Sequence, residues 1–141
     1  MFDQFLSGTN QQFLISLGFA LICGIVIGVE RELRKKPAGV STQALVVVGA
    51  TLFTFLSANV VGADKTRIAA QVVSGIGFLG AGLIIKIKDG KELTNVTTAA
   101  SIWYAAAVGM AIGFGFHFIG VVSALTAVLI SRIPKISSDE R

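Results

Sequence analysis

Five apolar stretches, each close to the length of a membrane-spanning helix, constrain the fold of this 141-residue chain more than any other feature. A helix needs about 20 predominantly apolar residues to cross the hydrocarbon core of a bilayer. The composition agrees, because 53% of the residues are apolar and only 14% are charged. We therefore predict an all-α membrane protein, a compact bundle of five transmembrane helices. The stretches are Phe13 to Val29, Leu45 to Val61, Ile68 to Ile85, about Thr94 to Gly113 and about Phe114 to Ile133.

The division between the last two spans rests on a run of 39 residues, Leu93 to Ser131, that contains no acid, lysine or arginine. This run is too long for one helix across the membrane and has the right length for two. Gly113, Gly115 and His117 supply the break, because glycine favours turns.

The basic residues predict the orientation, because lysine and arginine collect in cytoplasmic loops. With five spans, ten of the twelve basic residues fall on one side, and only Lys65 and Arg67 fall on the other. We predict the N-terminus outside and the C-terminus in the cytoplasm, with residues 1–133 as the membrane domain and 134–141 as a short cytoplasmic tail. The ten are Arg31, Arg34, Lys35, Lys36, Lys86, Lys88, Lys91, Arg132, Lys135 and Arg141.

Small residues recur every three or four positions in four of the spans and form a stripe on one face of each helix. In lipid, such residues let helix backbones approach closely. We interpret the stripes as packing surfaces of the bundle and of a homodimer or other homo-oligomer; the alternative is that some line a narrow pathway. The stripes are Ser16, Ala20, Gly24 and Gly28; Ala50, Thr54 and Ala58; Ala70, Ser74, Gly77 and Ala81; and Thr97, Ser101, Ala105, Gly109 and Gly113.

The third span carries four glycines within nine residues, at Gly75, Gly77, Gly80 and Gly82. Each costs about 1 kcal/mol relative to alanine inside a helix, so the block needs a compensating role. We expect neighbouring helices to press against this backbone. The alternative is a helix that unwinds in mid-membrane, so that its carbonyls face a cavity. Trp103 is expected to face the bundle interior, where a hydroxyl or a freed carbonyl could accept from its indole N–H; the alternative is a large packing residue opposite these glycines.

Charged residues cluster directly after the first span. If the helix continues to Lys36, Glu30 faces Arg34 at the favourable i,i+4 spacing. Glu32 then faces Lys36, and Pro37 stops the helix. Because two glutamates at a helix C-terminus oppose its dipole, their presence favours a bound cation, a basic partner or a fixed salt bridge.

The apolar cores of the spans contain no acid, lysine or arginine, so the intramembrane charge expected of many ion-coupled transporters is missing. We take Glu30 and Glu32 as candidate Mg²⁺ ligands, because magnesium prefers carboxylate oxygens, and expect no resident cofactor. Neutral oxygens deeper in the membrane could come from Gln71, Ser74, Thr97 and Thr98.

Signs of catalysis are missing from the sequence: there is no nucleophile paired with a base, no HExxH and no phosphate loop. A single cysteine excludes an intramolecular disulfide. We expect no enzyme. The net charge of +4 reflects membrane orientation and lipid, so we expect no nucleic-acid partner.

Four blocks of the sequence resemble signature motifs of the MgtC/SapB family of bacterial membrane proteins: GVERE (28–32), KPAG (36–39), RIAAQVVSGIGFLGAG (67–82) and TTAASIW (97–103). The glycine-rich third block is the most specific. The resemblance covers about Leu14 to Gly120. It implies a multi-pass protein of the bacterial inner membrane with a five-span domain, associated with growth at low magnesium and, in pathogens, with survival in macrophages.

The resemblance implies two candidate functions. The first is a non-enzymatic protein of magnesium or ion homeostasis that acts through membrane-protein partners such as the ATP synthase. The alternative is a small magnesium or ion transporter or channel with a path along the glycine block. The functional motif then comprises Glu30, Arg31, Glu32, Arg34, Gln71, Ser74, Gly75, Gly77, Gly80, Gly82, Thr97, Thr98 and Trp103.

The sequence departs from the family pattern in two ways. Family members often read Ala-Gly-Leu-Arg-Thr-His where residues 38–43 of this chain read AGVSTQ, so an arginine and a histidine are lost. We therefore do not expect a contact that depends on those two side chains in this chain. The chain also ends soon after the fifth span, which we take as a short form without the soluble C-terminal domain of longer members.

Overall fold

The computed structural model describes residues 8–59, 64, 66–86 and 93–134, and these residues form five helices and one two-stranded hairpin. Three of the helices are long and apolar enough to cross a membrane, whereas α4 and α6 have 17 and 15 residues. The all-α prediction is confirmed for this part of the chain, and the orientation stays a prediction. The helices are α2 (Gly8–Leu33), α3 (Val40–Asn59), α4 (Arg67–Leu83), α5 (Val96–Gly113) and α6 (His117–Ser131); the strands are β1 (Ile85–Lys86) and β2 (Leu93–Thr94).

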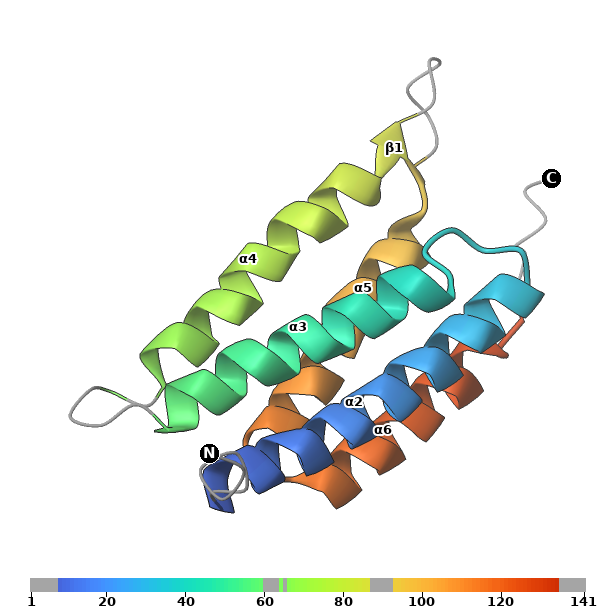
Figure 1. Cartoon of the computed structure of the whole chain (residues 1–141). Helices are drawn as coiled ribbons and strands as arrows, with labels where there is room; N and C mark the ends of the chain where they lie inside the picture. The colour runs from blue at the N-terminus through green and yellow to red at the C-terminus, as the bar shows by residue number, and fades with distance from the viewer. Residues whose placement is uncertain (1–7, 60–63, 65, 87–92, 135–141) are drawn as a thin grey trace, which may run out of the picture.

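Four of the helices pack side by side, and α4 lies at the edge of the bundle (Figure 1). The buried core is built by α2, α3, α5 and α6, and its centre consists of small and medium side chains. Helix α4 packs against α3 and α5, and Ala69 is its one buried residue. The core residues are Ala20, Cys23, Ile27, Val47, Ala105, Val108, Ile112 and Ala124.

Helix α2 ends at Leu33 and not near Pro37, so the predicted stop is wrong. Lys35 adopts a left-handed conformation with φ 53°. The Lys36 amide donates to the Arg31 carbonyl at 3.0 Å and the Lys35 amide to the Glu32 carbonyl at 2.9 Å, which is the Schellman pattern of a helix C-terminus. Hydrogen bonds to carbonyls of its last turn therefore end the helix before Pro37.

The predicted break between the last two spans is confirmed. Helix α5 ends at Gly113, and Gly115 has φ 87°, a conformation that glycine adopts without steric cost. The amides of Gly115 and Phe116 donate to the carbonyls of Ile112 and Ala111, both at 2.9 Å. A tight turn of this kind lets α6 return along α5.

Helices α2 and α6 run parallel, although they are the first and last of the described helices. Near one end of the pair, Ser16 Oγ lies 2.9 Å from Nε2 of His117. Near the other end, Glu30 contacts Arg132. The two helices are thus joined by polar contacts at both ends.

Glycines in α2 and α5 allow close contact with α3, which confirms the packing interpretation for these two stripes. A Cβ added at Gly24 would lie 2.6 Å from the Ala44 Cα, and one at Gly113 would lie 2.6 Å from the Thr51 carbonyl oxygen. A Cβ at Gly109 would likewise collide with the Val47 carbonyl. Only glycine permits these backbone separations.

The glycines of α4 behave differently: within the described chain the predicted unwinding is wrong, and the predicted packing is wrong at three of the four glycines. The helix is unbroken from Arg67 to Leu83, so it does not unwind. An added Cβ at Gly75, Gly77 or Gly82 would meet no atom within 4 Å, and one at Gly80 would lie 3.8 Å from Ala99 of α5, an ordinary van der Waals distance. Neighbouring helices therefore do not press on the backbone at three of the four glycines, and α5 only touches the fourth.

Trp103 is 52% exposed, so the prediction that it faces the bundle interior is wrong. The buried face of α5 carries small residues, including Ala105 and Gly109. Because α5 lies so close to α3 at Gly109, there is no room for an indole ring between them.

Candidate functional site

Charged and polar side chains gather at one end of the bundle, where α2 and α6 end and α3 and α5 begin. Five of the predicted motif residues lie in this polar cluster. The cluster also contains residues that the motif did not include. Its members are Glu30, Arg31, Glu32, Arg34, Gln43, Thr98, Ser101, Ser131 and Arg132.

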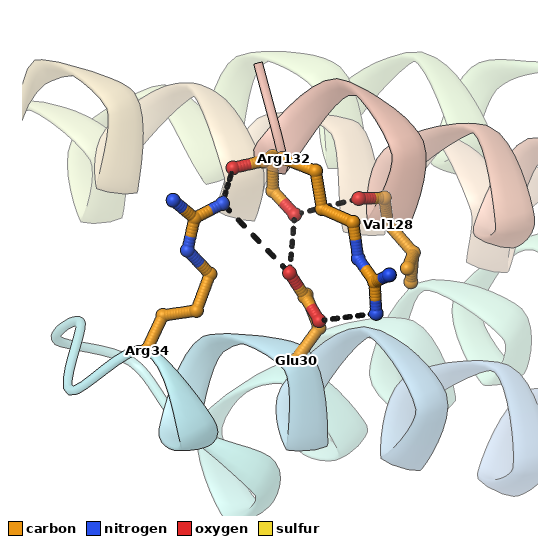
Figure 2. Close-up of polar contacts among 5 residues, drawn as sticks. Glu30, Arg34, Val128 and Arg132 are labelled. Carbon is orange, nitrogen blue, oxygen red and sulfur yellow. Dashed lines mark hydrogen bonds and ion pairs between the residues drawn. The ribbon is translucent and has the colours of Figure 1, made fainter. Parts of the chain in front are cut away.

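Glu30 is the acidic centre of the cluster and is only 8% exposed (Figure 2). Its Oε1 lies 3.8 Å from Nη1 of Arg34, which confirms the predicted i,i+4 pair. Its Oε2 lies 3.3 Å from Nη2 of Arg132, and the Ser131 hydroxyl lies 3.5 Å from Oε1. Arg34 also donates to the Ser131 carbonyl. The carboxylate is thus held by two guanidinium groups and joins α2 to α6.

Arg31 lies on the opposite side of this helix end and is 4% exposed. Its Nη2 donates to the Thr98 hydroxyl at 2.5 Å and to the Pro37 carbonyl at 2.8 Å. Within the described residues no carboxylate pairs with it. The charge is instead stabilised by oxygen dipoles, including a loop carbonyl, and the contact joins the end of α2 to the start of α5.

Gln43 is fully buried near the start of α3, and the motif prediction missed it. Its Nε2 donates to the Ala38 carbonyl at 3.3 Å and to the Ser101 hydroxyl at 3.1 Å, while its Oε1 has no partner in the described structure. The signal was present in the sequence, since Gln43 occupies the place of the histidine in the family pattern. The amide of Gln43 makes a buried polar contact at this position.

Glu32 caps the following helix, so its predicted pair with Lys36 does not form. The carboxylate accepts a hydrogen bond from the Val40 amide at 3.1 Å. Val40 is the first residue of α3, whose first amides lack partners within the helix. A side chain added at Gly39 would lie 2.7 Å from Oε2 of Glu32, so glycine leaves room for this contact.

These contacts bear on the candidate Mg²⁺ ligands. Glu30 is engaged by two arginines and Glu32 by the Val40 amide. In the part of the chain that the structure describes, no three residues of the types His, Cys, Asp and Glu come together. Of the three explanations for the two glutamates, the structure shows a fixed salt bridge at Glu30 and a helix cap at Glu32.

The remaining motif residues lie elsewhere. Thr97 and Trp103 are on the exposed face of α5, next to the buried Thr98. Gln71, Ser74 and the four glycines are on α4. The predicted motif therefore divides between the polar cluster and α4.

Helices α3 and α4 enclose an apolar groove of about 580 Å³. Gln71 and Gly75 line it, and Ser74 and Gly77 do not. Polar side chains in the lining come from Thr42 and Gln71 alone, and the other lining residues are apolar or glycine. Helix α4 thus has two distinct faces. One face lines the groove. The other, which we call the outer face, carries the exposed residues Ala70, Ser74, Gly77 and Ala81.

Comparisons with known proteins place the chain in a family. A profile of the MgtC family matches residues 17–137. "Putative magnesium transporter YhiD" of Escherichia coli (strain K12) is 40% identical over 131 residues, covering 86% of this chain and 60% of that protein. "Protein SapB" of Bacillus subtilis (strain 168) is 39% identical over 117 residues, covering 77% and 50%. "Protein MgtC" of Salmonella typhimurium (strain LT2) is 39% identical over 121 residues, covering 86% and 51%.

The chain therefore spans half to three fifths of the length of these curated relatives. No solved structure matches it. The profile nevertheless covers both the polar cluster and α4. The chain is a multi-pass membrane protein and belongs to the MgtC/SapB family.

Proposed function

We propose that this protein acts in magnesium or ion homeostasis at the bacterial inner membrane, in adaptation to low magnesium, by binding other membrane proteins and without catalysing a reaction. One relative carries the name "Putative magnesium transporter YhiD", which supports the link to magnesium. The proposal includes five membrane spans, with the C-terminus in the cytoplasm. Partners within its scope are a second copy of the chain and a complex such as the ATP synthase.

The observation that carries this proposal is the outer face of α4. Ala70, Ser74, Gly77 and Ala81 lie on it one helical turn apart, and all four are exposed. Stripes of the same kind in α2 and α5 pack against α3. Because lipid tails do not need such a stripe, an uncovered one favours another membrane helix as its partner.

The transporter alternative is supported by the name of the E. coli relative. A path along the glycine block would run in the groove between α3 and α4. The walls of that groove are apolar apart from Thr42 and Gln71. Since Mg²⁺ gives up its water shell reluctantly and takes carboxylate ligands, this lining favours the partner-binding function.

A growth experiment tests the proposal. Gly77→Leu should abolish complementation of a deletion strain at low magnesium, because the new side chain covers the outer face of α4. Gly18→Leu is the matched control, since an added Cβ there also meets no atom within 4 Å but lies on α2. Normal growth with Gly77→Leu would contradict partner binding through this face.

A flux assay separates the two functions. Purified protein in liposomes should move neither Mg²⁺ nor protons down a gradient. Flux that depends on Gly75 would support the transporter alternative and overturn the partner-binding proposal.

A further inference from the structure

The groove between α3 and α4 has the length of a lipid tail. On α4 it runs from Ile68 to Leu79, a rise of about 16 Å at 1.5 Å per residue. One leaflet of the hydrocarbon core is about 15 Å thick. Leu45, Phe53 and Leu79 of the lining are more than half exposed, so the groove opens to its surroundings. In a membrane protein, the surroundings of such a groove are lipid.

Two glycines hold the groove open. Gly49 on α3 and Gly75 on α4 both line it, and an added Cβ at either would meet no atom within 4 Å. The volume of about 580 Å³ lies within the range of about 300 to 1,000 Å³ that is typical of small-molecule sites. It equals roughly twenty times the 30 Å³ share of one liquid water, and a methylene group is of similar size. One acyl chain would fill it.

The end of the groove near the start of α4 is polar. Gln71 lines the groove, and Arg67, which is not part of the lining, lies one helical turn before Gln71. Both are exposed. Within the described residues, neither side chain has a hydrogen-bond or ion-pair partner. The nearby Asp64 carboxylate accepts instead from the amide and hydroxyl of Thr66.

We propose that this groove binds one phospholipid, with an acyl chain along Gly49 and Gly75 and the phosphate held by Arg67 and Gln71. A guanidinium binds phosphate through paired charge-assisted hydrogen bonds, and Gln71 adds an amide donor. Within the described residues Arg67 has no ion-pair partner and lies one turn before Gln71, so its charge is complementary to an anionic headgroup above an acyl chain. The site uses the groove face of α4 and does not depend on the outer face.

Native mass spectrometry of the full chain in detergent, with phosphatidylglycerol added, tests this site. The wild type should retain one lipid. Gly75→Leu should lose it, because the side chain fills the groove. Arg67→Gln should weaken binding at least about tenfold, because a neutral amide replaces the paired charge-assisted hydrogen bonds of the guanidinium. Gly77→Leu is the matched control on the outer face and should retain the lipid.

A second variant tests the groove from its other wall. Gly49→Leu on α3 should also lose the lipid, and circular dichroism should show an unchanged helix content in each variant. Equal lipid retention in all variants would overturn the proposal. A second result would also overturn the proposal: the wild type retains no lipid and forms a dimer, and Gly75→Leu abolishes that dimer. A second copy of the chain would then occupy the groove. Failure of this site leaves the growth phenotype of Gly77→Leu unaffected, so the two proposals fail separately.

Discussion

The glycines of α2 and α5 and those of α4 have opposite surroundings. A Cβ at Gly24 or Gly113 would lie 2.6 Å from the backbone of α3, whereas one at Gly77 would meet no atom within 4 Å. The intrinsic helix penalty of glycine is the same in both places. In α2 and α5 close packing offsets this penalty inside the chain, whereas at Gly75, Gly77 and Gly82 of α4 no contact within the described chain offsets it. The buried core of this fold is therefore built by four helices, and α4 carries an exposed outer face and one wall of the groove.

The largest expected effect tests this contrast with one substitution at two sites. Gly109→Ala should lower the free energy of unfolding by about 3 kcal/mol, because the new methyl group collides with the Val47 carbonyl and Ala50. Gly77→Ala should raise it by up to about 1 kcal/mol, since alanine is the better helix former and space is free. Unfolding in detergent followed by circular dichroism measures both. Effects of the same sign would break the comparison.

The buried contact of Arg31 should have the next largest effect. Thr98→Val removes the hydroxyl that accepts from the guanidinium, and we expect a loss of about 2 kcal/mol in the free energy of unfolding. Thr97→Val is the control, because Thr97 is exposed and its replacement should change stability by less than about 0.5 kcal/mol. The same detergent unfolding assay applies. Equal losses at the two positions would show that the buried contact contributes nothing.

The salt bridge of Glu30 should contribute less. Glu30→Gln should cost about 1 kcal/mol, since both arginine partners are partly exposed and solvent screens the pair. Thermal unfolding of wild type and variant, with and without millimolar Mg²⁺, measures this. If Mg²⁺ stabilised the wild type and not the variant, a cation at Glu30 would replace the salt bridge as the role of this carboxylate.

The smallest effect is expected at the start of α4. Hydrogen bonds from the Thr66 hydroxyl and amide lower the pKa of Asp64 below its ordinary value of 3.8. A carboxyl group with a lowered pKa stabilises the fold above its ordinary pKa, and the contribution is lost as the pH falls through the folded value. At pH values below about 4, the stability near α4 should therefore decrease slightly, and Asp64→Asn should remove this pH dependence. Hydrogen exchange at the Thr66 amide reports it.

The sequence predicts the helices well because their signals are local. Length and hydropathy define five apolar runs, and Gly115 marks the turn between the last two. The predicted end of α2 is wrong because Lys35 adopts the left-handed conformation. Glycine or asparagine usually marks such a position in a sequence, and a lysine does not. The i,i+4 pair of Glu30 and Arg34 was predictable for the same local reason.

Contacts between distant residues were not predictable. Arg132 and Ser131 reach Glu30 across about a hundred residues of sequence, and no spacing rule connects them. The sequence also does not tell whether a stripe of small residues faces the bundle or its surroundings, because periodicity identifies a helix face but not the element that packs against it. The α4 stripe thus consists of the same kinds of small residue as the stripe of α2 and faces outward instead.

The parallel pairing of α2 and α6 has a consequence for biosynthesis. Glu30 is translated 102 residues before Arg132, an interval of about 5 to 20 seconds at 5 to 20 residues per second. During that time Arg132 is not available to pair with the carboxylate, because α6 has not yet been made. Arg34 follows Glu30 by only four residues and can pair with it as soon as that helical turn forms. One arginine thus neutralises the glutamate while the chain is being inserted, and the other joins it to the last helix once the bundle is complete.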